Sequence, residues 1–346
     1  MKQILIIFCI LSVSFQALAQ DKKKATNGEF WGKSEAYLHK QAFQMFGLID
    51  EALTENPPVV GAPMVRKLAL YNLDAMLHET KYDNTEPFNN FVASRMQQLL
   101  VELNNPVKKG LKIFKVYNDG FIARTQSTTF AFDLVRGSIQ GKEIVSEECI
   151  KQIVEHCDIL FITHNHGDHA DRLVADLFIE AGKPVIVPTN IWPDDKVIQH
   201  LRSDEIIDKE IALKNGKKLQ VKILPGHQSE LMNNIYVVTT EEKKTIVQTG
   251  DQYHKEDINW LMNIHQKIPC PDALLVNCWS NRMNDLIEGF APKFVITGHE
   301  NEMGHTIDHR EAFCLTFQKM EEIKRNYVVM GWGEWFLCKK QLKTTI

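Results

Sequence analysis

Apolar positions in the first third of the chain follow the three-to-four-residue spacing of amphipathic helices. One such stripe runs through 38–53 and stops before a Pro-Pro pair, which disfavours continuation of a helix. A second is expected over 63–77 and a third from about 85 to 103. None of the three carries a metal-binding motif, so we expect residues 20–108 to form an N-terminal helical region.

The hydrophobic spacing changes to the alternation of strands after Gly110. Strands are expected at 112–117 and 121–126 around Asn118-Asp119-Gly120, a hairpin turn signal. The further strands expected are 129–135, 159–163, 184–188, 219–224, 235–240, 245–249, 273–277, 294–297 and 327–330, with helices at 146–156, 170–181, 254–265 and 310–323. Hairpins combined with strand–helix units predict an α+β domain over residues 109–346, with two sheets covered by helices.

Composition and charge narrow the class of protein. The 346 residues are 44% hydrophobic and 24% charged, which excludes disordered, collagenous and low-complexity chains. The formal net charge of −4 and the pI near 6.4 give no basic excess. A nucleic-acid partner is therefore not expected, and the partner we expect is a small-molecule substrate.

Residues 1–19 have the pattern of a secretory signal peptide. Lys2 precedes an apolar run over 4–15, and Ala17-Leu18-Ala19 has the small-x-small form of a signal-peptidase site. The run is shorter than the ~20 residues that cross a bilayer, and Cys9 lacks the small preceding residues of a lipidated cysteine. We expect cleavage after Ala19, export to the periplasm or the medium, and no membrane span after cleavage.

The cysteines remaining after such cleavage could pair in an oxidising compartment, but the sequence does not choose among the pairings. No two form a CxxC pair, so neither a thioredoxin-like site nor a zinc ribbon is indicated. The expectation is that most are buried thiols. They are Cys149, Cys157, Cys270, Cys278, Cys314 and Cys338.

The stretch 163–169, Thr-His-Asn-His-Gly-Asp-His, places three imidazoles and a carboxylate directly after an expected strand. In an extended segment His164 and His166 point to the same side. The following glycine lets the chain turn, so that Asp168 and His169 face a second point. Two such clusters of nitrogen and oxygen donors suit two zinc ions. The alternative is a polar loop that is His-rich by chance, which this spacing makes rare.

This HxHxDH motif resembles that of the metallo-β-lactamase superfamily of metal-dependent hydrolases. In that family a distant His, a distant Asp and a final His follow the motif, each at the end of a strand. The chain has candidates in the same order at His227, Asp251 and His299, each after an expected strand. The resemblance covers the chain from about residue 110 and implies a four-layer αββα sandwich.

The resemblance also implies two zinc sites that share a carboxylate. The first zinc would be held by His164, His166 and His227, and the second by Asp168, His169 and His299, with Asp251 bridging them. Manganese or iron could replace zinc. A diiron redox site would normally come with a flavin-binding domain, and nothing in the sequence resembles one.

Asp251 separates the chain from the lactam-hydrolysing members, which place Ser or Cys near this position. The bridging-Asp branch contains lactonases, thioester hydrolases and phosphodiesterases, so antibiotic hydrolysis is disfavoured. The resemblance implies an exported dinuclear zinc hydrolase in which a metal-bridged hydroxide attacks an ester, lactone or thioester-like bond. A phosphodiesterase for a small phosphodiester, or a metal-binding protein that acts by interaction without catalysis, remain the alternatives.

Other polar and aromatic residues near these strand ends allow two interpretations each. Asp168 is expected to accept a proton during attack. His305 could hydrogen-bond the substrate or cap the next helix. Tyr253 and His254 could line the pocket or begin a helix, and Trp279 could form a substrate wall or a core contact.

Overall fold

The computed structural model describes residues 31–79, 86–139 and 141–339, so the expected signal peptide and Cys9 lie outside the described residues. The chain divides into two compact units, Met1–Met45 and Phe46–Ile346. This division falls inside helix α2 (Ser34–Glu55). All the residues considered below for function belong to the second unit. In the described part of the chain, no helix combines the length and the apolar content needed to cross a membrane.

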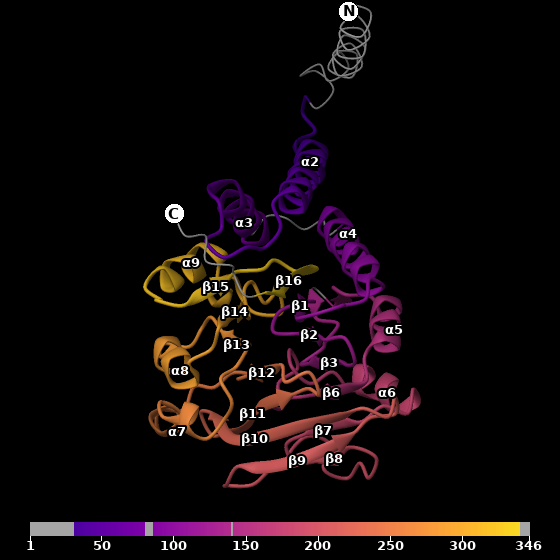
Figure 1. The fold of residues 1–346 in the computed structure, drawn as a ribbon. Helices are drawn as coiled ribbons and strands as arrows, with labels where there is room; N and C mark the ends of the chain where they lie inside the picture. The colour runs from indigo at the N-terminus through magenta and orange to yellow at the C-terminus, as the bar shows by residue number, and fades with distance from the viewer. Residues whose placement is uncertain (1–30, 80–85, 140, 340–346) are drawn as a thin grey trace, which may run out of the picture. The chain divides into compact units, whose positions relative to one another are not determined.

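Two 7-stranded sheets form the centre of the second unit (Figure 1). The first sheet has the order β16 (Glu334–Cys338), β1 (Leu111–Lys115), β2 (Phe121–Arg124), β3 (Thr129–Phe132), β6 (Ile159–Phe161), β7 (Val185–Val187) and β8 (Gln199–His200). The second has the order β15 (Asn326–Val328), β14 (Phe294–Gly298), β13 (Ala273–Asn277), β12 (Thr245–Gln248), β11 (Leu231–Thr239), β10 (Lys218–Gln228) and β9 (Ile207–Ala212). A small hairpin, β4 (Ser138–Ile139) and β5 (Lys142–Glu143), lies apart from both.

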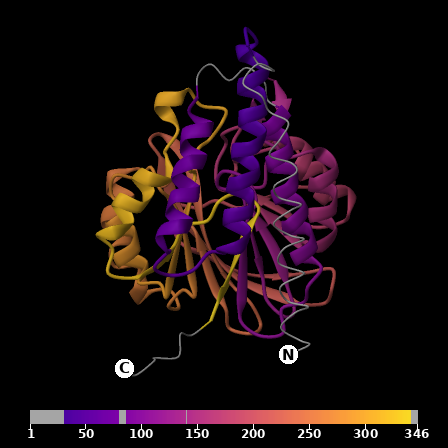
Figure 2. The same ribbon diagram turned by 90° about the horizontal axis from the view of Figure 1, so that it is seen from above.

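Helices cover the outer faces of both sheets, and an apolar layer fills the space between them. The helices are α3 (Met64–Leu77), α4 (Glu86–Leu103), α5 (Glu147–His156), α6 (Arg172–Glu180), α7 (Lys255–Leu261), α8 (Met283–Phe290) and α9 (Phe313–Glu321), with the short helices η2 (Ile264–Gln266) and η3 (Ile307–His309). Helices α3 to α6 pack on the first sheet, and α7 and α8 on the second. Figure 2 shows the magenta and the orange helices on opposite flanks of the strands.

The layer between the sheets is aromatic and aliphatic, as the alternation of buried positions requires. The rings of Phe161 from β6 and Tyr236 from β11 lie 5.0 Å apart across it. Helix α9 joins the two outer layers, because Phe317 packs with the first cluster and Met320 with the cluster around α8. The four-layer αββα sandwich expected from the sequence is confirmed.

Helices α3 and α4 pack into the same unit as the sheets. The guanidinium of Arg66 in α3 donates to both oxygens of Glu334 in β16, and Arg95 in α4 lies 3.3 Å from the same carboxylate. Asp74 in α3 accepts from the backbone N–H groups of Phe313 and Cys314 at the start of α9. Helices α3 and α4 therefore belong to the same compact unit as the two sheets.

The strand ends that precede the expected functional residues meet at one edge of the sandwich. β3, β6 and β7 run parallel, as do β12, β13, β14 and β15, so their carboxyl ends lie on a common side of each sheet. The two sheets are joined there by an isolated bridge between His164 and Asn233 and by a backbone hydrogen bond from Asn234 to Thr163. Segments distant in sequence are thereby brought to one place.

Candidate metal centre

The loop after β6 is held in place by a buried carboxylate. Thr163 donates its backbone N–H and its hydroxyl to the two oxygens of Asp133, both at 2.7 Å. The chain then turns, because His169 and the residue after it donate their N–H groups to the carbonyl of His166. This turn brings the ring of His169 beside the ring of His164, with centroids 4.1 Å apart.

Asp251 and His299 reach the same edge from the second sheet. Asp251 follows Gly250, whose φ of +52° and close approach to Asn233 and Thr163 leave no room for a side chain. His299 follows β14 with φ at +72°, a conformation that a non-glycine residue adopts at some energetic cost. Backbone strain at such a position is typical of functional sites.

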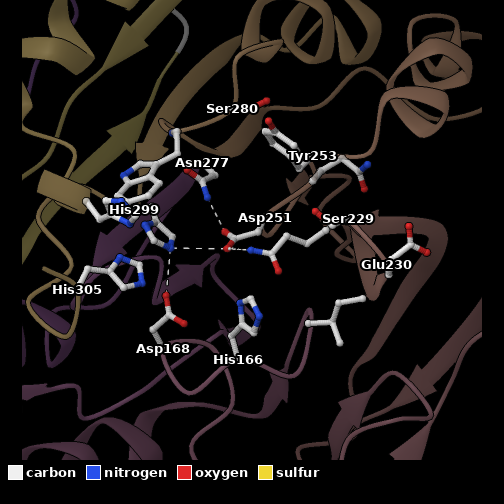
Figure 3. A pocket seen from close by; sticks show the side chains of 15 residues that line it. His166, Asp168, Ser229, Glu230, Asp251, Tyr253, Asn277, Ser280, His299 and His305 are labelled. Carbon is white, nitrogen blue, oxygen red and sulfur yellow. Dashed lines mark hydrogen bonds and ion pairs between the residues drawn. The ribbon is translucent and has the colours of Figure 1, made fainter.

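The donor atoms converge on Asp251 and His169. His299 Nε2 lies 3.0 Å from Asp168 Oδ2, and His169 Nε2 lies 3.5 Å from the same oxygen and 3.3 Å from Asp251 Oδ1. His164 Nε2 lies 3.5 Å from Asp251 Oδ2 and 3.1 Å from His166 Nδ1. Figure 3 shows Asp168, Asp251 and His299 facing one another, with His166 beside them.

The residues present fit divalent metal ions. Two sets of three donors each lie within 4.8 Å of one another, namely His164, His169 and Asp251, and Asp168, His169 and His299. Within the described part of the chain, Nε2 of both His169 and His299 is buried and lies close to carboxylate oxygens, but neither nitrogen makes a hydrogen bond of good geometry. Unpartnered buried nitrogens are costly, and a metal ion would satisfy both of them. The mixture of imidazole nitrogen and carboxylate oxygen suits zinc, iron or manganese.

The histidines and aspartates of the centre shift one another's pKa values. Although burial acts in the opposite direction, Asp251 and Asp168 raise the pKa of His299 to about 9. Burial would raise the pKa of Asp168, but His169 and His299 hold it below its usual range. Burial and the neighbouring His169 lower the pKa of His164. Asp168 and Asp251 therefore remain ionised beside these imidazoles.

Several residues that hold these donors were not anticipated from the sequence. Asp133 accepts from His169 Nδ1 at 3.1 Å, and Gln248 donates to both Asp133 and Asp119. Burial raises the pKa of Asp119 to about 7. Asn277, at the end of β13, donates to Asp251 (Figure 3). A carboxylate or an amide behind a ligand fixes the orientation of that ligand and strengthens metal binding.

The structure does not bring His227 into the centre. Its Nδ1 lies 2.9 Å from Asp257 Oδ2, and its Nε2 lies 3.0 Å from the guanidinium of Arg202. The potential donor group that includes His227 is completed by His254 and Asp257. Of the seven expected ligands, six are therefore adjacent and one is separate.

A cavity of about 650 Å³ opens beside the donor atoms. The residues lining it include Asp168, Asp251, His299, Gln228, Glu230, Tyr253, Asn277, Trp279, His305 and His309 (Figure 3). Trp279 packs on the rings of His299 and His305, with centroids 5.4 and 5.3 Å away, so its position is in the cavity wall. His305 also lines the cavity. It is not the N-cap of the next helix, because the N-cap residue of η3 is Thr306.

Tyr253 is half exposed at the rim of the cavity, and His254 precedes α7 without a capping hydrogen bond from its side chain. Burial and the neighbouring His299 lower the pKa of His305.

All six described cysteines are free thiols, and four of them are buried. The expectation that most cysteines are buried thiols is thus met in the described residues.

Comparisons with known proteins give structural matches alone, because no protein-family model and no curated protein matches the chain in sequence. Igni18, a metallo hydrolase from the hyperthermophilic archaeon Ignicoccus hospitalis, is similar with a TM-score of 0.50 and 15% identity, over 66% of this chain and 98% of that one. CmlA, a diiron β-hydroxylase from Streptomyces venezuelae, has a TM-score of 0.47 and 15% identity, over 67% of this chain and 55% of its own.

An isothiocyanate hydrolase from Delia radicum gut bacteria has a TM-score of 0.46 and 13% identity, over 66% of this chain and 100% of its own. At 15% identity, the structural likeness to Igni18 shows the fold alone and leaves the substrate open. The chain has a four-layer αββα fold that is similar to that of the metallo hydrolase Igni18.

Proposed function

We propose that the protein is a metal-dependent hydrolase that binds two divalent cations, Zn²⁺ in the first instance, and cleaves an ester, lactone or thioester-like bond. The observation that carries this proposal is the convergence of Asp168, His169, Asp251 and His299 beside a cavity large enough for a small molecule. Unpartnered buried nitrogens at this convergence support metal binding over a purely structural role.

The residues that would hold the cations divide into two sets. Asp168, His169 and His299 make one set, His164 and His166 contribute to the other, and Asp251 lies between them. Two divalent cations at such a site lower the pKa of a water molecule and stabilise negative charge that develops on the attacked group. The chain supplies the remaining functions of binding, orientation and proton transfer.

Asp168 and His305 are positioned for proton transfer. Asp168 faces the cavity and accepts from Asn118 at 3.2 Å, which fixes its carboxylate. His305 presents an imidazole to the same cavity, and its lowered pKa keeps it neutral at pH 7, so that it can accept or donate a proton. Trp279 and the ring of His299 hold the imidazole from two sides. We assign His305 to accepting the proton released during attack and passing it to the leaving group.

The cavity favours a neutral acyl substrate over a phosphodiester. Among the described residues that line it, none is a lysine or an arginine, whereas phosphate recognition commonly uses these side chains. Basic side chains do line two neighbouring pockets. Lys255 and Arg282 line one, where Arg282 pairs with Asp285. Arg136 and Arg172 line the other, where they pair with Asp171 and Asp176. Trp279 and Tyr253 provide apolar surface for an acyl or alkyl chain.

We also propose that the protein is exported, because residues 1–19 have the sequence pattern of a secretory signal peptide. Free thiols at the described cysteines make the fold independent of disulfide formation in either compartment. N-terminal sequencing of the protein from its native host tests this directly, because an exported chain begins near Gln20 and a retained one keeps Met1.

The activity is tested with the full chain stripped of metal and reloaded with Zn²⁺, Mn²⁺ or Fe²⁺. Each form is assayed on an aryl ester, a lactone, a thioester, an aryl phosphodiester and a chromogenic β-lactam. We expect the highest kcat/KM among the three acyl substrates, loss of turnover after chelation and recovery after metal return. Preferential turnover of the phosphodiester or the lactam would contradict the proposed substrate class, and absence of all turnover with metal bound would favour a non-catalytic binding protein.

A further inference from the structure

His227 is the expected ligand that lies apart from the centre, and both of its ring nitrogens already have protein partners. Nδ1 faces the carboxylate of Asp257 at 2.9 Å, and Nε2 faces the guanidinium of Arg202 at 3.0 Å. A guanidinium has donors and no acceptor, so the lone pair in this contact belongs to Nε2 of His227. The proton of the imidazole is therefore on Nδ1, which donates to Asp257.

This arrangement withholds the nitrogen that a metal would need. A metal ion binds the lone pair of a neutral imidazole, and at Nε2 that lone pair accepts a hydrogen bond from a permanent cation. A divalent ion bound at Nε2 would lie beside the guanidinium of Arg202, and the two positive charges would repel each other. The same argument disfavours a separate metal site at His227, His254 and Asp257, although their donor atoms lie within 4.8 Å of one another.

Both partners of His227 are themselves anchored. Arg202 also donates to the carbonyls of Gly226 at 3.0 Å and Asn233 at 3.2 Å. On the other side, Gln252 donates to Asp257 at 3.3 Å and accepts from the backbone N–H of His227 at 3.1 Å. The imidazole is thus held between two fixed groups, and its backbone is held with it.

Gln228, the residue after His227, lies beside the centre. Successive side chains of a strand point to opposite faces, and the pairing of β10 with β11 continues without interruption through His227 and Gln228. Gln228 accordingly points toward the cavity and donates to Asp251 Oδ2 at 3.1 Å. A neutral amide therefore occupies the side of Asp251 at which the resemblance placed an imidazole.

We infer that His227 is not a metal ligand in this chain and that the two metal sites are unequal. One site has four donors, from Asp168, His169, Asp251 and His299, and the other has His164, His166 and the shared Asp251 alone. The inference rests on the proposed function, because it requires that metal binds at all. It assigns Arg202 and Asp257 the role of positioning residues that keep His227 outside the centre.

The experiment is a metal titration of the full chain and of three variants. The stripped proteins are titrated with Zn²⁺ and with Co²⁺ against a competing chelator, and the bound equivalents are counted by native mass spectrometry. We expect the parent to bind a first equivalent more tightly than a second, and His227→Ala to bind both with unchanged affinity. His299→Ala, the matched control, should lose affinity for the first equivalent by more than the roughly 10–100-fold typical of residues behind a ligand.

Arg202→Met keeps the apolar stem and removes the cation, so it frees Nε2 and should tighten the second equivalent. Unchanged binding by Arg202→Met would overturn the role assigned to Arg202. Loss of an equivalent in His227→Ala would overturn the inference and leave the proposed metal centre intact, whereas a parent that binds no metal would overturn both.

A measurement on the unmodified chain covers the case in which a variant fails to fold. Long-range ¹H–¹⁵N spectra follow the imidazole nitrogens during Zn²⁺ addition. We expect the Nε2 signal of His299 to move and the signals of His227 to keep the pattern of a neutral ring protonated at Nδ1. A metal-induced shift at Nε2 of His227 would contradict the inference.

Discussion

Asp133 accepts a hydrogen bond from Nδ1 of His169 at 3.1 Å and simultaneously holds the backbone and hydroxyl of Thr163 at 2.7 Å. One buried carboxylate thus orients a metal-facing imidazole and fixes the start of the loop that carries it. Its own backbone has a φ of +46°, which an aspartate tolerates better than most residues. The orientation of His169 depends on this contact as much as on its place in the motif.

Asp133→Asn should therefore weaken metal binding without removing a direct ligand. The amide keeps the size of the side chain but loses the charge, and outer partners of this kind are typically worth 10–100-fold in metal affinity. Chelator competition measures the change. Asp272→Asn, at a buried aspartate paired with Lys244 and Lys293 far along the second sheet, is the matched control and should leave metal affinity unchanged.

His305→Ala should lower turnover and spare the metal. A side chain that transfers a proton in the transition state contributes roughly 10²–10⁴-fold to kcat, and His305 lies outside the donor groups. Parallel measurements of kcat and of bound metal separate the two effects. His309→Ala, at an exposed imidazole on the same cavity wall, should change kcat little. Equal losses in both variants would contradict the assignment of proton transfer to His305.

Glu334→Gln should destabilise the fold through the contact between the N-terminal helices and the first sheet. The carboxylate is 1% exposed and faces both Arg66 and Arg95, so its loss leaves buried cations without a counter-charge. Breaking a buried pair in this way costs about 3–5 kcal/mol. Chemical unfolding with excess chelator present measures the difference without a contribution from metal. Lys67→Ala, which removes a more exposed ion pair with Glu321, should cost about 0–1 kcal/mol.

Cys270 should be the thiol that alkylates first in the native protein. It is exposed, whereas burial raises the pKa of Cys149 to about 11 and that of Cys157 to about 12. Because the thiolate is the reactive form, buried thiols with raised pKa values remain protonated and unreactive at pH 8. Mass spectrometry after brief alkylation identifies the modified residues, and denatured protein provides the fully modified reference. Rapid native modification of Cys157 would show that its environment opens readily.

The expected ligands at strand ends illustrate how far the sequence predicts the site. The 163–169 motif, Asp251 and His299 were recognisable because each follows an apolar strand, and parallel strands deliver their carboxyl ends to the same edge. Asp133 carried no comparable signal, because the expected strand 129–135 placed it inside a strand, whereas β3 ends at Phe132. Its contact with His169 arises from tertiary structure.

His227 and Gln228 show a second limit. Which of two adjacent residues faces the centre depends on the register of β10 against β11, and a shift of one position reverses the faces. The position of Arg202 beside His227 comes from a separate loop after β8, which no local pattern reveals. The sequence could therefore place this segment at the site without identifying the side chain that faces it.

The elements that were not expected include α8 and the strands β4, β5, β8, β9 and β16. β9 is largely exposed and carries Asp208, Lys209 and Glu210, so it has the composition of a loop, and it becomes a strand by pairing with β10. β16 follows a Gly-Trp-Gly turn and is completed by pairing with β1, more than two hundred residues earlier in the chain. Pairing over such separations leaves little trace in local alternation.

The most direct test of a shared metal centre is the variant Asp251→Asn, measured for bound metal and for kcat/KM on the best acyl substrate. Asp251 lies between the two donor sets and is held by Asn277 and Gln228, so the amide replaces a full negative charge with a single neutral oxygen at the point where both sets meet. We expect metal content and kcat/KM to fall together. An Asp251→Asn protein that keeps two equivalents of metal and near-parental kcat/KM would contradict the shared centre.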